Sequence, residues 1–443
     1  MHFVDRLFLT WYSPEALAAG MPAGILNYAI ACIFIGTAGY VSTFVAQYTG
    51  ANRNHAIGPV LWQGLYISVI GGIVLGLMAP FASAFFKTIG HGETLRPLET
   101  VYFQVLCIGV APAVASAALS GFFSGLGKTV PIMWVNIVIN IVHIALDYAL
   151  IFGKWGSPEM GIRGAAIASV ASTFIGFILF AVMIFNRGNE ARFRVLTGWR
   201  PDARIFSKLL KYGLPSSMQI FLDVGGFAAF VLLVGRLGPT ELAASNLAFN
   251  INSFAFLPML GIGTAVSVLV GRYLGADNDR LAARSVWSAF QITLLYMCSV
   301  AFAYITIPQV FFIPHAMKAD PATFPAVSAL AILLLRFVAF FSIFDTLNII
   351  FGSALRGAGD TRFVMMMLAV VSIFGLVLPT WFAVVVLQKG IFTAWFIISG
   401  YCVLLGFSFL VRFLTGKWRS MRVIEETLPI LSPMAPETAT NEF

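Results

Sequence analysis

The sequence is short of charge. Only 10% of its 443 residues are Asp, Glu, Lys or Arg, whereas 59% are apolar, and the mean hydropathy is +0.89. Soluble globular domains are about one quarter charged, so this composition excludes a soluble protein. The formal net charge of +8 is therefore interpreted as a signal of membrane topology rather than of nucleic-acid binding.

Cysteine and the common catalytic motifs are also scarce. The four cysteines each lie inside an apolar run without a CxxC spacing, which favours apolar packing over a disulfide framework or a metal site. The sequence has no GxxxxGK[ST], HExxH or GxSxG motif. ATP-driven transport by this chain alone, zinc proteolysis and serine hydrolysis therefore lack support. We predict a protein that is not an enzyme and has no cofactor.

Long apolar runs are abundant instead. A spanning helix needs about 20 apolar residues, so the chain has room for about twelve crossings. We predict an all-α polytopic membrane protein with eleven complete spans, near residues 17–47, 58–86, 98–126, 129–152, 162–186, 207–236, 242–274, 283–313, 328–356, 362–386 and 390–414. Residues 1–12 form an apolar stub that is too short to cross.

The two halves of the chain repeat each other. The segment QYTGANRN at residues 47–54 is echoed by RYLGADND at residues 272–279, and GLGKT at 125–129 is echoed by GAGDT at 357–361. Agreement at nearly one offset indicates duplication. Since the second copy begins with a complete span, we expect the stub to be the end of a first helix whose beginning is missing from this sequence.

Duplication predicts the topology. Six spans per copy is an even number, so we expect two six-helix bundles related by a pseudo-two-fold axis along the membrane normal. Most Lys and Arg residues fall in the loops on one side, which places the central linker and the C-terminus in the cytoplasm. The predicted segments are an N-terminal lobe (1–186), a cytoplasmic linker (187–206), a C-terminal lobe (207–417) and a cytoplasmic tail (418–443).

Ionisable residues inside the apolar helices are few. They are costly in a bilayer unless they face a cavity or a partner, so they mark candidate functional sites. One stripe in the first half contains Asn136, Asn140, His143 and Asp147 at helical spacing. The second half has three polar faces: Asp223 with Ser216 and Gln219, Asp345 with Ser342 and Asn348, and Asn250 with Asn246 and Ser253. Buried carboxylates can exchange a proton or a hard cation, although a structural hydrogen-bond seam is the alternative.

Several segments carry a family resemblance. FVDRLF, VAQYTGA, SGFFSGLGKTVP, HIALDYALIFG, YGLPSSMQIFLDV, GRYLGAD and FDTLNIIFGSALRGAGDTR together resemble the MATE (multidrug and toxic compound extrusion) family, nearest its NorM-type branch, over about residues 3–420. The resemblance implies a twelve-helix monomeric antiporter of two lobes. Such a protein opens alternately to either side and exports organic cations in exchange for Na⁺ or H⁺.

The resemblance also assigns residues. Asp5 matches the first-helix acid of the family, and Asp147 with His143 matches a polar pair near the hydroxyl position held by Ser169. Asp223 takes the place where NorM-type members commonly have Glu, and Asp345 matches their tenth-helix Asp. The predicted ion-coupling and substrate-binding residues are Asp223, Asp345, Asp147, Asp5, His143, Asn140, Ser169, Gln219 and Asn250. Na⁺ is one candidate ion at Asp223 and Asp345, whereas His143 favours a proton.

The predicted function is secondary antiport in the bacterial inner membrane, with small lipophilic organic cations exported in exchange for H⁺ or Na⁺. Two alternatives stay open. A flippase for a lipid-linked saccharide should line its cavity with several Arg or Lys residues. A non-transporting membrane subunit or receptor would need no carboxylate in each half.

Overall fold

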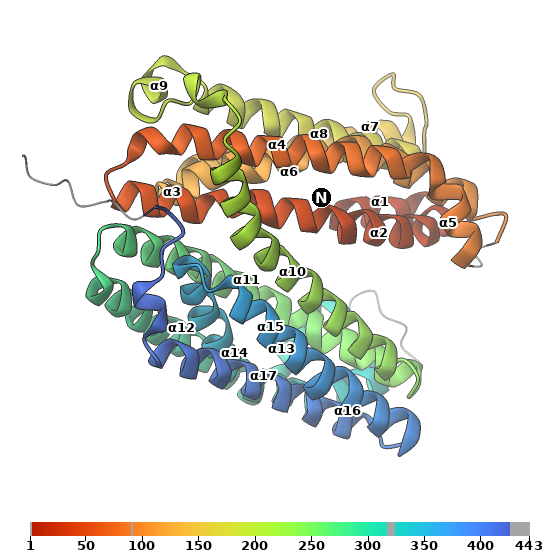
Figure 1. The fold of residues 1–443 in the computed structure, drawn as a ribbon. Coiled ribbons are helices and arrows are strands. Elements are labelled where there is room, and N and C mark those ends of the chain that lie inside the picture. Colours follow the sequence, from red (N-terminus) through yellow and green to blue (C-terminus); the bar gives the residue numbers. More distant parts are fainter. Residues whose placement is uncertain (1, 90–91, 317–323, 426–443) are drawn as a thin grey trace, which may run out of the picture.

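The computed structural model describes residues 2–89, 92–316 and 324–425, and within these ranges the chain is helical, with no strand (Figure 1). The N-terminal lobe contains α1 (His2–Tyr12), α2 (Pro14–Gly39), α3 (Val41–Gly50), η1 (Asn54–Ala56), α4 (Ile57–Met78), η2 (Ala79–Phe81), α5 (Ala82–Ile89), α6 (Arg96–Gly125), α7 (Thr129–Phe152) and α8 (Ile162–Ile184). The linker contains α9 (Arg187–Phe193) and η3 (Thr197–Trp199).

The C-terminal lobe follows the linker. It contains α10 (Ala203–Val234), α11 (Pro239–Gly275), α12 (Asp279–Thr306), α13 (Pro308–Ala316), α14 (Phe324–Ala358), α15 (Thr361–Val371), the π-helical η4 (Ser372–Val377), α16 (Leu378–Trp381), the π-helical η5 (Phe382–Val386), α17 (Ile391–Leu414) and η6 (Lys417–Ser420). The protein is thus an all-α polytopic membrane protein of two helical bundles.

Eleven helical stretches in the described ranges are long and apolar enough to cross a membrane. This confirms the predicted number of complete spans, and α1 coincides with the predicted stub. One predicted range, 283–313, is divided, because α12 ends at Thr306 and α13 begins at Pro308. Proline has no N–H to continue the ladder of the preceding helix.

Local sequence explains where several helices begin. Ser13 precedes Pro14 and Glu15, and its Oγ accepts a hydrogen bond from Ala16 N at 3.0 Å at the start of α2. Asp202 caps α10 in the same way, and Asn278 caps α12. Each side chain satisfies an amide that the first helical turn leaves without a partner.

The duplicated motifs adopt matching turns. Asn52 and Asp277, which occupy equivalent positions of the first repeat, both have a left-handed backbone, with φ of 56° and 52°. Gly127 and Gly359, equivalent in the second repeat, also have positive φ, 74° and 105°. Asn, Asp and Gly are the residues that tolerate this conformation best. The sequence repeat is therefore also a repeat of local structure.

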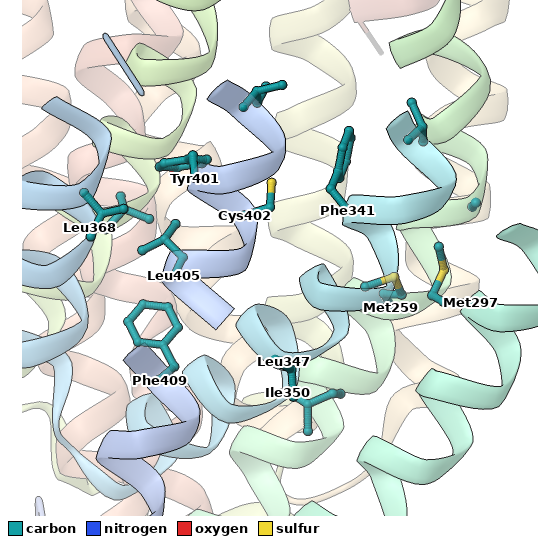
Figure 2. Packing of buried hydrophobic residues seen from close by; sticks show 14 of the residues in the cluster. Met259, Met297, Phe341, Leu347, Ile350, Leu368, Tyr401, Cys402, Leu405 and Phe409 are labelled. Carbon is teal, nitrogen blue, oxygen red and sulfur yellow. The ribbon is translucent and has the colours of Figure 1, made fainter. Parts of the chain in front are cut away.

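Each lobe has its own apolar core. One cluster gathers buried residues of α1–α8, and a second gathers those of α10–α17. The second cluster includes Phe341, Leu347 and Ile350 of α14 together with Tyr401, Cys402 and Leu405 of α17 (Figure 2). The first turns of α10, including the buried Leu209, pack on the N-terminal core.

The linker is attached to the N-terminal lobe. Trp62 Nε1 of α4 donates to the carbonyl oxygen of Val195 at 2.7 Å, and Tyr66 OH donates to that of Trp199. Gln63 Nε2 donates to the carbonyl oxygen of Arg200 at 3.4 Å. These bonds hold the linker against α4, and we call this end of the molecule the linker end.

The two lobes meet at the linker end (Figure 1). The hydroxyls of Thr37 and Ser217 are 3.0 Å apart, Tyr40 OH donates to the carbonyl oxygen of Arg356 at 2.7 Å, and Gln47 Nε2 donates to that of Gly357 at 3.2 Å. Two equivalent glycines of the repeat face the other lobe there. A Cβ on Gly50 would collide with the carbonyl oxygen of Arg272, and one on Gly275 with that of Gln47.

Candidate functional site

The N-terminal lobe gathers four of the predicted residues. Asp5 comes from α1, His143 and Asp147 are one turn apart on α7, and Ser169 comes from α8. His143 Nε2 lies 2.9 Å from Asp5 Oδ1 and 3.0 Å from Ser169 Oγ, which donates to Asp5 Oδ2 at 3.1 Å. His143 Nδ1 lies 3.5 Å from Asp147 Oδ2. An imidazole thus stands between two carboxyl groups.

This cluster is sealed from most of the solvent. His143 and Asp147 are fully buried, and Asp5 is 2% exposed. Ligand atoms of the three residues lie within 4.8 Å of one another. Neither oxygen of Asp147, nor His143 Nδ1, has a hydrogen-bond partner among the described residues. Buried polar atoms without partners are costly, so the cluster is suited to take up a proton or a small cation.

A pocket of about 250 Å³ leads from this cluster to the space between the lobes. Asp5 lines it together with Tyr102 of α6. Most of the other lining residues come from α2 and α10, and Gly20, Gly24 and Gly225 are among them. The pocket lies beyond the Thr37–Ser217 contact when viewed from the linker end, so the two helices touch at one end and separate toward the other.

The C-terminal lobe brings its two acids toward each other from α10 and α14. Asp223 is exposed, and Asp345 is partly buried and accepts a hydrogen bond from Asn348 Nδ2 at 3.0 Å. The two carboxyl groups are close enough to interact electrostatically. Gln219 lies one turn before Asp223 and is 8% exposed, and its Oε1 has no hydrogen-bond partner in the part of the chain that the structure describes.

Two predicted residues do not join these clusters. Asn140 is exposed, and its Nδ2 donates to the carbonyl oxygen of Asn136 on the same helix at 2.8 Å. Asn250 of α11 is exposed. On α11 it is instead Asn252 that reaches α14, where its Oδ1 accepts from Ser342 Oγ at 3.4 Å.

Sequence reasoning missed some participants. Tyr102 contacts Asp5 across the pocket wall, and Arg356 lies within electrostatic range of Asp223. Glu99 of α6 is completely buried in the N-terminal lobe. Glu99 is a charged residue inside an apolar span, so the criterion used for the other acids could have found it. Tyr102 lies one turn further along the same helix, and that criterion does not find it because its side chain is uncharged.

A membrane protein with two helical lobes, a pocket between them and buried or partly buried acids in each lobe has the architecture of a membrane transporter. The sequence profile of the family described as MatE matches residues 1–149 and 215–381. The chain belongs to this family, as the resemblance predicted.

Curated relatives extend the match over most of the chain. The protein described as "Probable multidrug resistance protein NorM" from Thermotoga maritima is 26% identical over 95% of this chain and 89% of its own length. The protein with the same description from Shewanella oneidensis is 31% identical over 82% of this chain and 78% of its own length.

Solved structures share the fold. The chain of "Crystal structure of MATE in complex with MaL6" has a TM-score of 0.84 at 20% identity, with 94% of this chain and 92% of that chain covered. The chain of "Outward-facing conformation of a multidrug resistance MATE family transporter of the MOP superfamily" has a TM-score of 0.82 at 20% identity, with coverages of 94% and 91%.

Proposed function

We propose that this chain is a multidrug efflux antiporter that exports small lipophilic organic cations in exchange for protons. It transports without catalysing a chemical conversion. It works as a monomer in the bacterial inner membrane, with the linker and the C-terminus in the cytoplasm. In that orientation the contact at the linker end closes the cytoplasmic side, and the pocket belongs to the outward-facing half of the transport pathway.

The observation that carries the proposal is the placement of His143 between Asp5 and Asp147. Two carboxylates in a buried site leave net negative charge, which is costly in a low-dielectric interior. Protons can remove that charge in steps, because an imidazole and two carboxyl groups offer three places for them. A nitrogen ligand suits Na⁺ poorly, since hard cations prefer oxygen, so this cluster favours a proton.

The C-terminal lobe offers a different set of ligands. Asp223, Asp345 and the amide oxygen of Gln219 are all oxygen donors, which suit Na⁺. Exchange of Na⁺ is therefore the alternative coupling for this lobe. Both versions share one principle, because the coupling ion and the cationic substrate compete for the same negative charge.

The interlobe pocket supports the choice of substrate. Its lining is mostly apolar and includes the aromatic rings of Tyr28, Tyr102 and Phe221. Aromatic faces attract organic cations by roughly 0.5–2 kcal/mol, and Asp5 supplies the opposite charge. When a proton neutralises Asp5, the attraction for the cation falls and the substrate is released.

The decisive experiment measures ethidium efflux from cells that lack other pumps, with and without a collapsed proton gradient. We expect efflux to stop when the gradient collapses. Asp223→Asn and Asp345→Asn should each reduce efflux, whereas Glu93→Gln, at an exposed acid outside the spans, should not. If both variants in the C-terminal lobe exported the dye at the parental rate, the assignment of these acids would be wrong.

Proteoliposomes separate the coupling ions. A pH gradient should drive ethidium transport in the absence of Na⁺, and His143→Asn should abolish that transport. If only a Na⁺ gradient drove transport, the coupling ion would be Na⁺ and not a proton. Absence of transport under both gradients, in a correctly folded protein, would favour a flippase or a non-transporting subunit.

A further inference from the structure

The segment that follows α17 crosses from one lobe to the other. We call Lys417–Glu425 the strap. Its beginning is fixed to the C-terminal lobe, because Trp418 is 1% exposed, stacks on Phe413 with ring centroids 4.8 Å apart, and donates its Nε1–H to the carbonyl oxygen of Phe413. Arg422 also bonds Asp277 at 3.1 Å, at the end of α11.

The far end of the strap belongs to the other lobe. Val423 and Ile424 are buried, and they are members of the apolar cluster of the N-terminal lobe. Val423 N donates to Gln47 Oε1 of α3 at 2.9 Å. In Figure 1 the segment after α17, drawn in dark blue, accordingly reaches the N-terminal lobe near α3. Two apolar side chains and one backbone amide thus insert across the boundary between the lobes.

Glu425 adds charge to this crossing. Arg53 of the N-terminal lobe donates from Nη1 to the backbone oxygen of Glu425 at 2.9 Å and from Nη2 to its Oε2 at 3.2 Å. Tyr48 OH donates to the same Oε2 at 3.1 Å. Lys208, at the start of α10, donates to Oε1 at 2.9 Å. Charge-assisted bonds of this kind are stronger than neutral ones.

These contacts depend on the arrangement of the lobes. Gln47 bonds both the strap and the carbonyl oxygen of Gly357, so the strap lies over the place where the lobes touch. A transporter of two lobes must separate them at the linker end to open that side. Separation would carry Arg53, Tyr48 and Gln47 away from a strap that Trp418 keeps on the other lobe.

We propose that the strap is a latch that stabilises the state closed at the linker end and is released when that end opens. The inference rests on the alternating access included in the proposed function, but not on the identity of the ion or the substrate. Removal of the latch raises the population of the state open at the linker end. Allosteric couplings of this kind usually amount to about 5- to 150-fold.

The test measures the distance between spin labels at His55 and Arg284, two exposed positions at the linker end of the two lobes. The four native cysteines are first replaced. A chain ending at Ser420 lacks the crossing part of the strap, and the matched control ends at Glu425. We expect the first truncation to shift the distance distribution toward the longer component by at least about fivefold relative to the second.

A point variant protects the test against misfolding. Arg53→Ala should shift the distribution in the same direction as the truncation, whereas Lys128→Ala, at an exposed cation of the same end, should not, because Glu425 pairs with Arg53 and Lys208 instead. The latch would be overturned if the two truncated proteins had equal distance distributions and Arg53→Ala had the parental one. Because the distances need no transport, a failure of ethidium efflux would count against the proposed function alone.

Discussion

One of the close approaches between the lobes yields a sharp prediction. Gly275 of α11 lies against the carbonyl oxygen of Gln47, and a Cβ there would come well inside van der Waals contact with it. The obstacle is backbone in a helix of the other lobe, so no flexible side chain can move aside. Gly275→Ala should therefore oppose closure of the linker end specifically.

The size of the effect follows from the cost of overpacking. An extra methyl group in a tightly packed site costs about 1–3 kcal/mol. Because this cost applies only when the linker end is closed, the whole amount shifts the equilibrium toward the open state. With about 1.4 kcal/mol for each factor of ten, the expected shift is roughly 5- to 150-fold.

The label pair at His55 and Arg284 measures this shift directly. Gly261→Ala is the matched control, because Gly261 is on the same helix and none of the described residues comes within 4 Å of its added Cβ. Both substitutions add one methyl group to a glycine of α11, so a difference between them reports the contact with Gln47. A Gly275→Ala distribution equal to that of Gly261→Ala would refute the reasoning.

Three further predictions concern charge, packing and the buried cluster. Burial opposes ionisation of Glu425, but the hydrogen bond and charge of Lys208 outweigh it and lower the Glu425 pKa. The contribution of Glu425 to docking of the strap should therefore be complete above the ordinary carboxyl range and be lost as the pH falls through the lowered pKa. The label distances should show this pH dependence in the parental protein and not in Glu425→Gln. Trp395 is fully buried, so Trp395→Ala should cost about 3–5 kcal/mol of stability and lower the melting temperature of the detergent-solubilised protein. Ser169→Ala removes a hydroxyl bonded to a charged group, worth about 1.5–3 kcal/mol, and should lower the efflux rate at least about tenfold. Ser172→Ala, which loses only a bond to its own helix, should keep the parental rate.

Length and periodicity were sufficient to predict the fold class. Apolar runs report directly on spans, because the bilayer requires about 20 apolar residues per crossing. The repeat predicted equivalent turns, and the positive φ of Asn52 and Asp277 agrees with it. The break at Pro308 was missed because a long apolar run continues through it.

The site was predictable where chemistry alone identifies a residue. A carboxylate or an imidazole inside a span is conspicuous, so Asp147 and His143 were found, and both are buried. Helical spacing gave Asn140 the same direction, yet it is exposed. Periodicity predicts the face of the helix on which a side chain lies, but it does not predict whether another helix packs against that face at a given position along the helix. Tyr102 and the strap residue Val423 meet their partners only through the tertiary fold.

The attachment of the linker to α4 limits where the molecule can bend. Side chains of α4 bond the backbone of the linker at Val195, Trp199 and Arg200. The connection between the lobes is therefore fixed to the N-terminal lobe as far as Arg200. Rotation of one lobe against the other must be absorbed by the few bonds before α10, or within α10 itself. Pro215 lies inside that helix near its contact with α2 and has no N–H to continue the hydrogen bonding, so a rotation of the lobes would bend α10 at this turn.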